Sequence, residues 1–186
     1  MGRREAEEAG VQNEKVTFAE RRHAPFHIMD LVIIERWGIE TMDTRELFAR
    51  LIQCEAGGEG DAGMRGVATV IGNRANITYG EFARINGGGD FRAVIEQRGQ
   101  FTCMRETVGG RYNPQNVYNM TPTQEHYDIA DWAIAGGRLA GVDHSLFFHN
   151  PYNPTCPTYF PTRVGVIHNR INDHCFYIPT SYYANT

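Results

Sequence analysis

The sequence has 186 residues, enough for one domain that buries roughly 70% of its unfolded surface. A hydrophobic content of 41%, a charged content of 22% and a formal net charge of -4 are ordinary for a globular protein and argue against a general nucleic-acid-binding protein. No stretch is apolar over enough residues to span a bilayer, and the N-terminus lacks the apolar region of a secretory signal.

The chain divides into a charged arm, residues 1–41, and one patterned domain, residues 42–186. Arg and Glu dominate the arm and its apolar periodicity is poor. We therefore expect the arm to be partly disordered or docked on the domain. Asp43 and Thr44 are candidate caps for the first helix, with Glu46 completing a capping box from Asp43.

The first patterned segment predicts a helix that ends at Gly57-Gly58. Leu47, Phe48, Leu51 and Ile52 repeat at the spacing of one helical face. Glu55 follows Leu51 by four residues, so it falls on that same apolar face, where an unpaired charge is costly. A surface position, or a pair with Arg50 or Arg74, is the alternative to a functional role for Glu55.

A second apolar helix, with Met64, Val67 and Ile71, is predicted to end near Asn73–Asn76 and to form a hairpin with the first. After a flexible glycine loop at 85–89, Asp90 can cap a short helix over 91–97. Residues 104–120 are expected to form a long polar and aromatic loop.

Thr121-Pro122-Thr123-Gln124 predicts the start of a helix, with Thr121 as the cap and Pro122 in its first turn. The helix should run to about Ala135, and its expected buried stripe is Tyr127, Ala130, Ala133 and Ile134. The remaining chain reads as strands over 145–149, 164–168 and 174–178, with a turn at 169–173 in which Asn172 takes the left-handed conformation.

Cysteines and histidines give no recognised metal pattern. The spacings of Cys54, Cys103, Cys156 and Cys175 match no paired zinc motif, and four free thiols are the default expectation. His144, His149, His168 and His174 cluster late in the chain, but their spacings are not those of a known ligand set. We therefore expect neither a metal nor another cofactor.

Five blocks in this order resemble the SleB/CwlJ cell wall hydrolase family, the spore cortex-lytic enzymes. The blocks are Glu55-Ala56, the segment Gly66–Arg74, Gly99-Gln100-Phe101-Thr102, Phe148-His149-Asn150-Pro151 and His174-Cys175-Phe176-Tyr177. The resemblance covers about residues 42–178. The chain departs from it at His149, where many relatives carry an aromatic residue, and at Asn172, where Gly is common.

The resemblance implies an α+β fold similar to lysozyme and lytic transglycosylases, mainly helical with a small C-terminal antiparallel sheet. It implies that Glu55 is the catalytic glutamate and that the substrate is peptidoglycan, especially the spore cortex. Spore coat proteins are further candidate partners, and a spore coat or cortex location is implied. A phage-encoded lysin made in the cytoplasm is the alternative.

Cleavage of a glycosidic bond needs a group that protonates the leaving oxygen. An unperturbed Glu, with a pKa of about 4.3, is only about 0.2% protonated at pH 7, and apolar neighbours could raise that fraction. In a lytic transglycosylase one Glu suffices, because the muramic 6-hydroxyl attacks in place of water. Glu59 or Asp61 as a second carboxylate would instead give ordinary hydrolysis. The candidate substrate-binding residues are Gln100, Phe101, Thr102, Phe148, Asn150, Tyr152 and Tyr177.

Two other functions remain open from the sequence. One is a cysteine-dependent peptidoglycan amidase or endopeptidase, with Cys54 or Cys103 as nucleophile and a late histidine as base. The other is a non-catalytic wall-binding or coat protein that keeps the fold.

Overall fold

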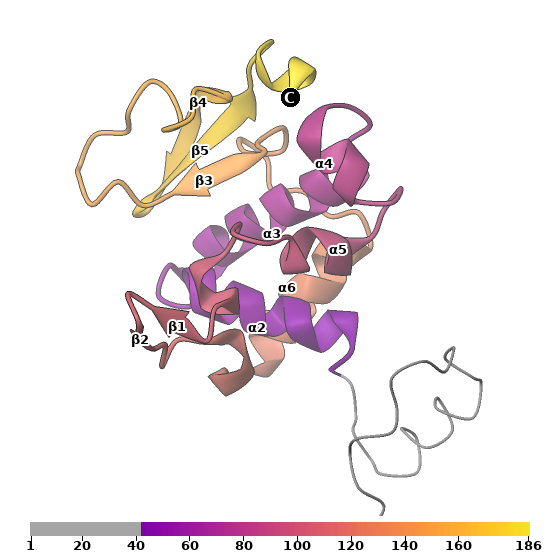
Figure 1. Ribbon diagram of the computed structural model, residues 1–186, viewed down its shortest axis with the longest axis vertical. Helices are drawn as coiled ribbons and strands as arrows, with labels where there is room; N and C mark the ends of the chain where they lie inside the picture. Colours follow the sequence, from indigo (N-terminus) through magenta and orange to yellow (C-terminus); the bar gives the residue numbers. More distant parts are fainter. Residues whose placement is uncertain (1–41) are drawn as a thin grey trace, which may run out of the picture. The chain divides into compact units, whose positions relative to one another are not determined.

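The computed structural model describes residues 42–186, and the predicted arm of residues 1–41 lies outside the described residues. The described part is an α+β domain, mainly helical with a small antiparallel sheet near the C-terminus, as predicted for a lysozyme-like fold (Figure 1). Its helices are α2 (Thr44–Ala56), α3 (Gly60–Asn76), α4 (Gly80–Ile85), α5 (Phe91–Glu96) and α6 (Gln124–Ile134). Its strands are β1 (Thr107–Val108), β2 (Arg111–Tyr112), β3 (Phe147–His149), β4 (Gly165–Ile171) and β5 (His174–Pro179). Within residues 42–186, no helix has the length and apolarity that a bilayer crossing would need.

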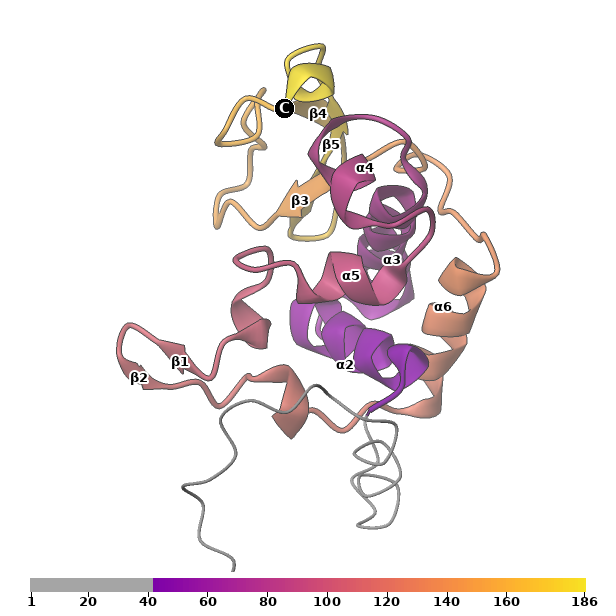
Figure 2. The same cartoon turned by 45° about the vertical axis from the view of Figure 1, so that its right-hand side comes forward.

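The predicted helical hairpin forms the centre of the domain. Leu51 and Ile52 of α2 are fully buried and belong to one core cluster with Val67 and Ile71 of α3. Helices α5 and α6 contact both helices of the hairpin. Helix α3 lies between the other helices, α2, α5 and α6, and the C-terminal sheet (Figure 1, Figure 2). Because α2 ends beside α3, its last turn is held at a fixed place near the sheet.

The N-caps agree with the sequence for α2 and α5 and differ for α6. The predicted capping box of α2 is not complete, because the Glu46 side chain pairs with Arg50 instead of reaching back to Asp43. Asp43 accepts a hydrogen bond from the Glu46 backbone N–H at 2.7 Å, a cap that is typically worth about 1 kcal/mol. The prediction that Thr121 caps the last helix is wrong. Thr123 is the cap, because its backbone N–H donates to His126 Nδ1 at 3.0 Å and ties the first turn to the chain before it.

The buried face of α6 also differs from the predicted stripe. Ile129, Ala130 and Ala133 face the core, whereas Ile134, predicted to be buried, is 43% exposed. His126 lies on the same buried face, one turn before Ile129 and Ala130, as the helical repeat requires.

The C-terminal sheet has the order β3-β5-β4, and both pairs are antiparallel. Strand β4 extends to Ile171, further than predicted, so the turn to β5 is shorter than the expected 169–173. Asn172 has a φ of 50°, the left-handed conformation predicted for it. A register irregularity between Ile167 and Asn169 leaves His168 as the extra residue of β4.

The cysteine expectation is wrong for two of the four residues. Cys156 and Cys175 form a disulfide, because the long loop before β4 brings their Cα atoms to 5.8 Å. This bond spans 19 residues, and closing such a loop stabilises a fold by about 3 kcal/mol in the chain-entropy model. Cys54 and Cys103 are free.

Helix α4 and the strands β1 and β2 were not predicted. Helix α4 places Phe82 in a second core cluster with Phe147 and Tyr183, beneath the sheet. Strands β1 and β2 form a small hairpin inside the predicted long loop, with Gly109 and Gly110 both at positive φ in its turn.

Candidate active site

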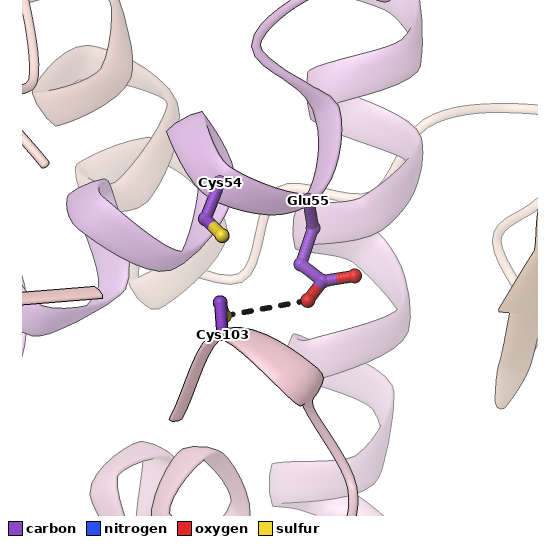
Figure 3. A group of neighbouring side chains, drawn as sticks. All are labelled: Cys54, Glu55 and Cys103. Atoms are coloured by element: carbon purple, nitrogen blue, oxygen red, sulfur yellow. Dashed lines mark hydrogen bonds between the residues drawn. The ribbon is translucent and has the colours of Figure 1, made fainter. Parts of the chain in front are cut away.

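Glu55 lies on the last turn of α2, directly before the end of the helix at Ala56. Figure 3 shows its carboxylate pointing away from α2 toward the short turn that carries Cys103. The apolar stripe that buries Leu51 and Ile52 therefore delivers a carboxyl group to the edge of the core, as the sequence spacing predicted.

A cavity of about 760 Å³ opens in front of this carboxylate. The end of α2, the segment 100–103, the end of β3, the loop before β4 and the start of β5 all contribute side chains to its wall. Besides Glu55, the carboxylate-bearing residues in its lining are Glu59 and Glu81, and the aromatic ones include Phe101, Phe148 and Tyr152. Its size fits a ligand of several hundred cubic ångströms rather than a single small ion.

The surroundings of Glu55 favour its protonated form. Burial raises the pKa of Glu55, while the hydrogen bond from Cys103 and the positive charge of Arg74 partly oppose this effect. Cys103 Sγ donates to Glu55 Oε1 at 3.4 Å (Figure 3). Among residues 42–186, the carboxylate of Glu55 takes part in no salt bridge. The alternative prediction, an ion pair of Glu55 with Arg50 or Arg74, is therefore wrong.

Arg74 is a buried cation in the wall of the cavity, and the sequence suggested it only as a potential partner of Glu55. Its side chain donates to the Leu146 carbonyl at 2.7 Å and to Gln100 Oε1 at 3.4 Å. It also lies 4.5 Å from the ring centroid of Phe82. Desolvation lowers the pKa of Arg74 to about 10, so it stays charged at neutral pH. The sequence spacing could have indicated that Arg74 is buried, because Arg74 lies on the same helical face as Val67 and Ile71.

The structure brings most of the predicted binding residues together. Gln100, Phe101, Thr102, Phe148, Asn150 and Tyr152 all line the cavity. Tyr177 does not line the cavity, so the prediction that it binds substrate is wrong. It is fully buried and stacks under His149 with ring centroids 5.5 Å apart, so it supports the cavity wall from behind.

Sequence reasoning missed a second polar pair in the wall. His174 Nδ1 lies 3.6 Å from Glu59 Oε2, and the Asp173 backbone N–H donates to the same oxygen at 3.0 Å. Burial lowers the pKa of His174, although Glu59 opposes this, and burial also lowers the pKa of His149. Both shifts favour the neutral form of the imidazole. No local pattern joins Glu59 to His174, because the contact depends on how the β4–β5 turn meets the start of α3.

The chain belongs to the cell wall hydrolase family, whose model matches residues 58–177. This confirms the resemblance seen in the sequence. The match begins three residues after Glu55 and therefore does not include it.

Two relatives carry a more particular name. The chain is 29% identical over 136 residues to the cell wall hydrolase CwlJ of Halalkalibacterium halodurans, covering 73% of this chain and 85% of that protein. It is 30% identical over 137 residues to the cell wall hydrolase CwlJ of Oceanobacillus iheyensis, covering 73% and 86%. The search of solved structures gives no significant match.

Proposed function

We propose that this domain cleaves the glycan strands of peptidoglycan, with Glu55 protonating the glycosidic oxygen, and that it does so as a lytic transglycosylase. The observation that carries the proposal is a largely buried carboxyl group at the wall of a cavity of about 760 Å³, with no salt bridge partner in the described part of the chain. The relatives' name, cell wall hydrolase, supports the substrate class.

The raised pKa of Glu55 supports the acid role, because each unit of increase raises the protonated fraction at neutral pH about tenfold. The hydrogen bond from Cys103 fixes one oxygen, which leaves the other to face a substrate oxygen. After transfer, the carboxylate would accept the proton of the attacking muramic 6-hydroxyl. One residue would thus serve as acid and then as base.

The other carboxylates of the site are already engaged, which favours a single-glutamate route. Glu59 accepts a backbone hydrogen bond and lies beside His174. Glu81 accepts a hydrogen bond from Gln97 at 2.7 Å. Asp61, the other candidate from the sequence, forms a salt bridge with Arg65 at 2.9 Å and is not among the cavity's lining residues. Ordinary hydrolysis would need one of these groups to orient a water molecule or to attack the sugar.

The cysteine-dependent alternative receives less support. Cys103 lies next to Cys54, is buried and donates to a carboxylate, all of which raise the pKa of its thiol and disfavour the nucleophilic thiolate. The pKa of Cys54 is lowered through its interaction with Cys103, but its thiol donates to the Gln115 carbonyl at 3.2 Å rather than to an imidazole. A base–nucleophile pair of the usual kind is thus not assembled among the described residues.

The test compares Glu55→Gln with Glu59→Gln and with Glu125→Gln, an exposed carboxylate on α6 that serves as the matched control. Purified peptidoglycan, with and without muramic lactam, is digested and the products are analysed by mass spectrometry. We expect 1,6-anhydro-muramic ends from the wild type and from Glu125→Gln, and no products from Glu55→Gln. If the wild type instead gives ordinary reducing ends, and Glu59→Gln does not, the mechanism is hydrolysis with Glu59 as the second carboxylate and not transglycosylation.

The same digestion separates the remaining alternatives. Peptide-bond products that survive in Glu55→Gln would indicate an amidase or endopeptidase. Binding to intact wall with no soluble product over time would indicate a non-catalytic wall-binding protein. The proposed substrate source is the spore cortex, with the spore coat or cortex as the location and a phage-encoded lysin as the alternative. Lactam-dependent cleavage would support the cortex.

A further inference from the structure

We infer that Cys54, Glu55 and Cys103 form a binding site for a thiophilic divalent cation such as Zn²⁺, and that the bound cation switches the site off. The two sulfurs and a carboxylate oxygen of these residues all lie within 4.8 Å of one another. Figure 3 shows the three side chains converging from the end of α2 and from the turn of Cys103. Both cysteines are free, since the chain's disulfide joins two other residues.

The spacing agrees with tetrahedral zinc. With Zn–S bonds of about 2.3 Å and Zn–O bonds of about 2.0 Å, a sulfur and an oxygen on one tetrahedral ion lie about 3.5 Å apart, and two sulfurs about 3.8 Å. Cys103 Sγ and Glu55 Oε1 are 3.4 Å apart. The upper limit of 4.8 Å for the other pairs means that small side-chain rotations suffice to bring all three atoms around one ion.

The ligand set and the surrounding charge favour a borderline-soft cation. Two thiolates select zinc or cadmium over magnesium or calcium, which prefer oxygen ligands. Binding would release the protons of the two thiols and of Glu55 to solvent. Two thiolates, one carboxylate and a divalent cation carry one net negative charge, which the buried cation Arg74 balances. Cys54, Glu55 and Cys103 all line the cavity, so water could reach a bound ion and supply a fourth ligand.

The consequence for activity rests on the proposed function. A metal-bound Glu55 carboxylate holds no proton, so it cannot protonate a glycosidic oxygen. The cation therefore acts as an inhibitor that is removed by chelation. Metal binding itself does not depend on the function, and it can be measured without any substrate.

The binding experiment uses Cd²⁺ and Zn²⁺ on the full chain, after a thiol titration under non-reducing conditions that should count two free thiols. We expect one Cd²⁺ per chain with a cadmium–thiolate charge-transfer absorption, and one Zn²⁺ per chain by calorimetry. Cys54→Ser and Cys103→Ala should each weaken Zn²⁺ binding more than about 100-fold, because even changes outside the ligand shell cost 10- to 100-fold. Glu125→Gln should bind as the wild type does.

Absence of the absorption in the folded wild type overturns the site, as does equal Zn²⁺ affinity in Cys54→Ser. A count of zero free thiols also overturns it, because the two cysteines would then be joined as a disulfide. Two of these three outcomes are read on the wild type, so the test does not depend on a variant that folds.

The activity experiment then measures glycan cleavage with and without saturating Zn²⁺. The wild type should lose at least about 90% of its activity with Zn²⁺ and recover it with a chelator. The rate of Cys54→Ser should be the same with and without Zn²⁺. Zn²⁺ that raises the rate overturns the inhibitory role. A wild type that cleaves no glycan in any condition defeats the proposed function, while the cadmium absorption still decides whether the site exists.

Discussion

Gly66 of α3 provides a sharp test of how the helical layer meets the sheet. A Cβ atom added to Gly66 would lie 2.6 Å from Cζ and 3.1 Å from Cε1 of Phe176 on β5. Phe176 is fully buried and packs with Val70 and Val142, so its ring has no free space to enter. We therefore choose Gly66→Ala as the perturbation.

Two opposing effects set the size of the change. Replacing Gly by Ala inside a helix is worth about 0.8–1.0 kcal/mol of helix propensity. Overpacking a well-packed core costs about 1–3 kcal/mol, and a contact of 2.6 Å lies far below an ordinary carbon–carbon separation. The rings of Phe148 and His174 also pack against Phe176, at 6.2 and 6.4 Å between centroids, and hinder its displacement. Because the ring cannot move away easily, we place the overpacking cost in the upper part of its range, at about 2–3 kcal/mol, which leaves a net loss of about 1–2 kcal/mol.

Urea denaturation followed by circular dichroism measures this loss as a lower midpoint at unchanged slope. Gly58→Ala is the matched control, because a Cβ there meets no atom within 4 Å. The control should lie between no change and a gain of about 1 kcal/mol, since it only restricts the unfolded chain. If Gly66→Ala is as stable as the wild type or more stable, α3 does not pack against β5 as described.

Three further predictions concern the site itself. Burial raises the pKa of Glu55, so the folded state holds this proton more tightly than the unfolded chain, and ionisation costs stability as pH rises above the ordinary value of 4.5. The stability of Glu55→Gln relative to the wild type should therefore be greater at pH 7 than at pH 4 in urea denaturation, and a pH-independent difference would contradict the burial. In the same assay, Asn172→Ala should lower the free energy of unfolding by about 1–2 kcal/mol. The substitution removes a residue suited to a φ of 50° and its hydrogen bond to the Glu59 carbonyl. Asn172→Gly should lower the free energy of unfolding by less, because glycine also adopts this φ. Tyr152 is 94% exposed at the cavity, so Tyr152→Ala should raise the KM for glycan several-fold with a change in stability below about 0.5 kcal/mol; an unchanged KM would remove Tyr152 from substrate binding.

The elements that periodicity and capping specify were predictable. Helix α2 was expected to end at the Gly57-Gly58 pair with Glu55 on its apolar face, and Asn172 was expected in the left-handed turn. These features depend on residues within one or two turns of each other. The family resemblance then indicated which sequence blocks line the cavity. It depends on five blocks that occur in a fixed order, and no single block would have been specific enough.

The features that depend on distant contacts were not predictable. Helix α4 has only six residues and is held by Phe82 packing against Tyr183, a hundred residues away in the chain. The Cys156–Cys175 disulfide and the Glu59–His174 pair likewise require the loop before β4 and the β4–β5 turn to fold back onto other elements. Tyr177 was assigned to substrate binding because it stands in a motif, whereas its side chain faces the core.

The central claim is that Glu55 presents a proton to the cavity near neutral pH, and a carbon-13 NMR titration of its carboxyl group tests this most directly. The resonance is assigned by comparison with Glu55→Gln and followed from acid to neutral pH in metal-free protein. We predict a midpoint clearly above the ordinary value of 4.5. A midpoint at or below 4.5 would mean that the carboxyl group is ionised throughout the neutral range, which contradicts the account.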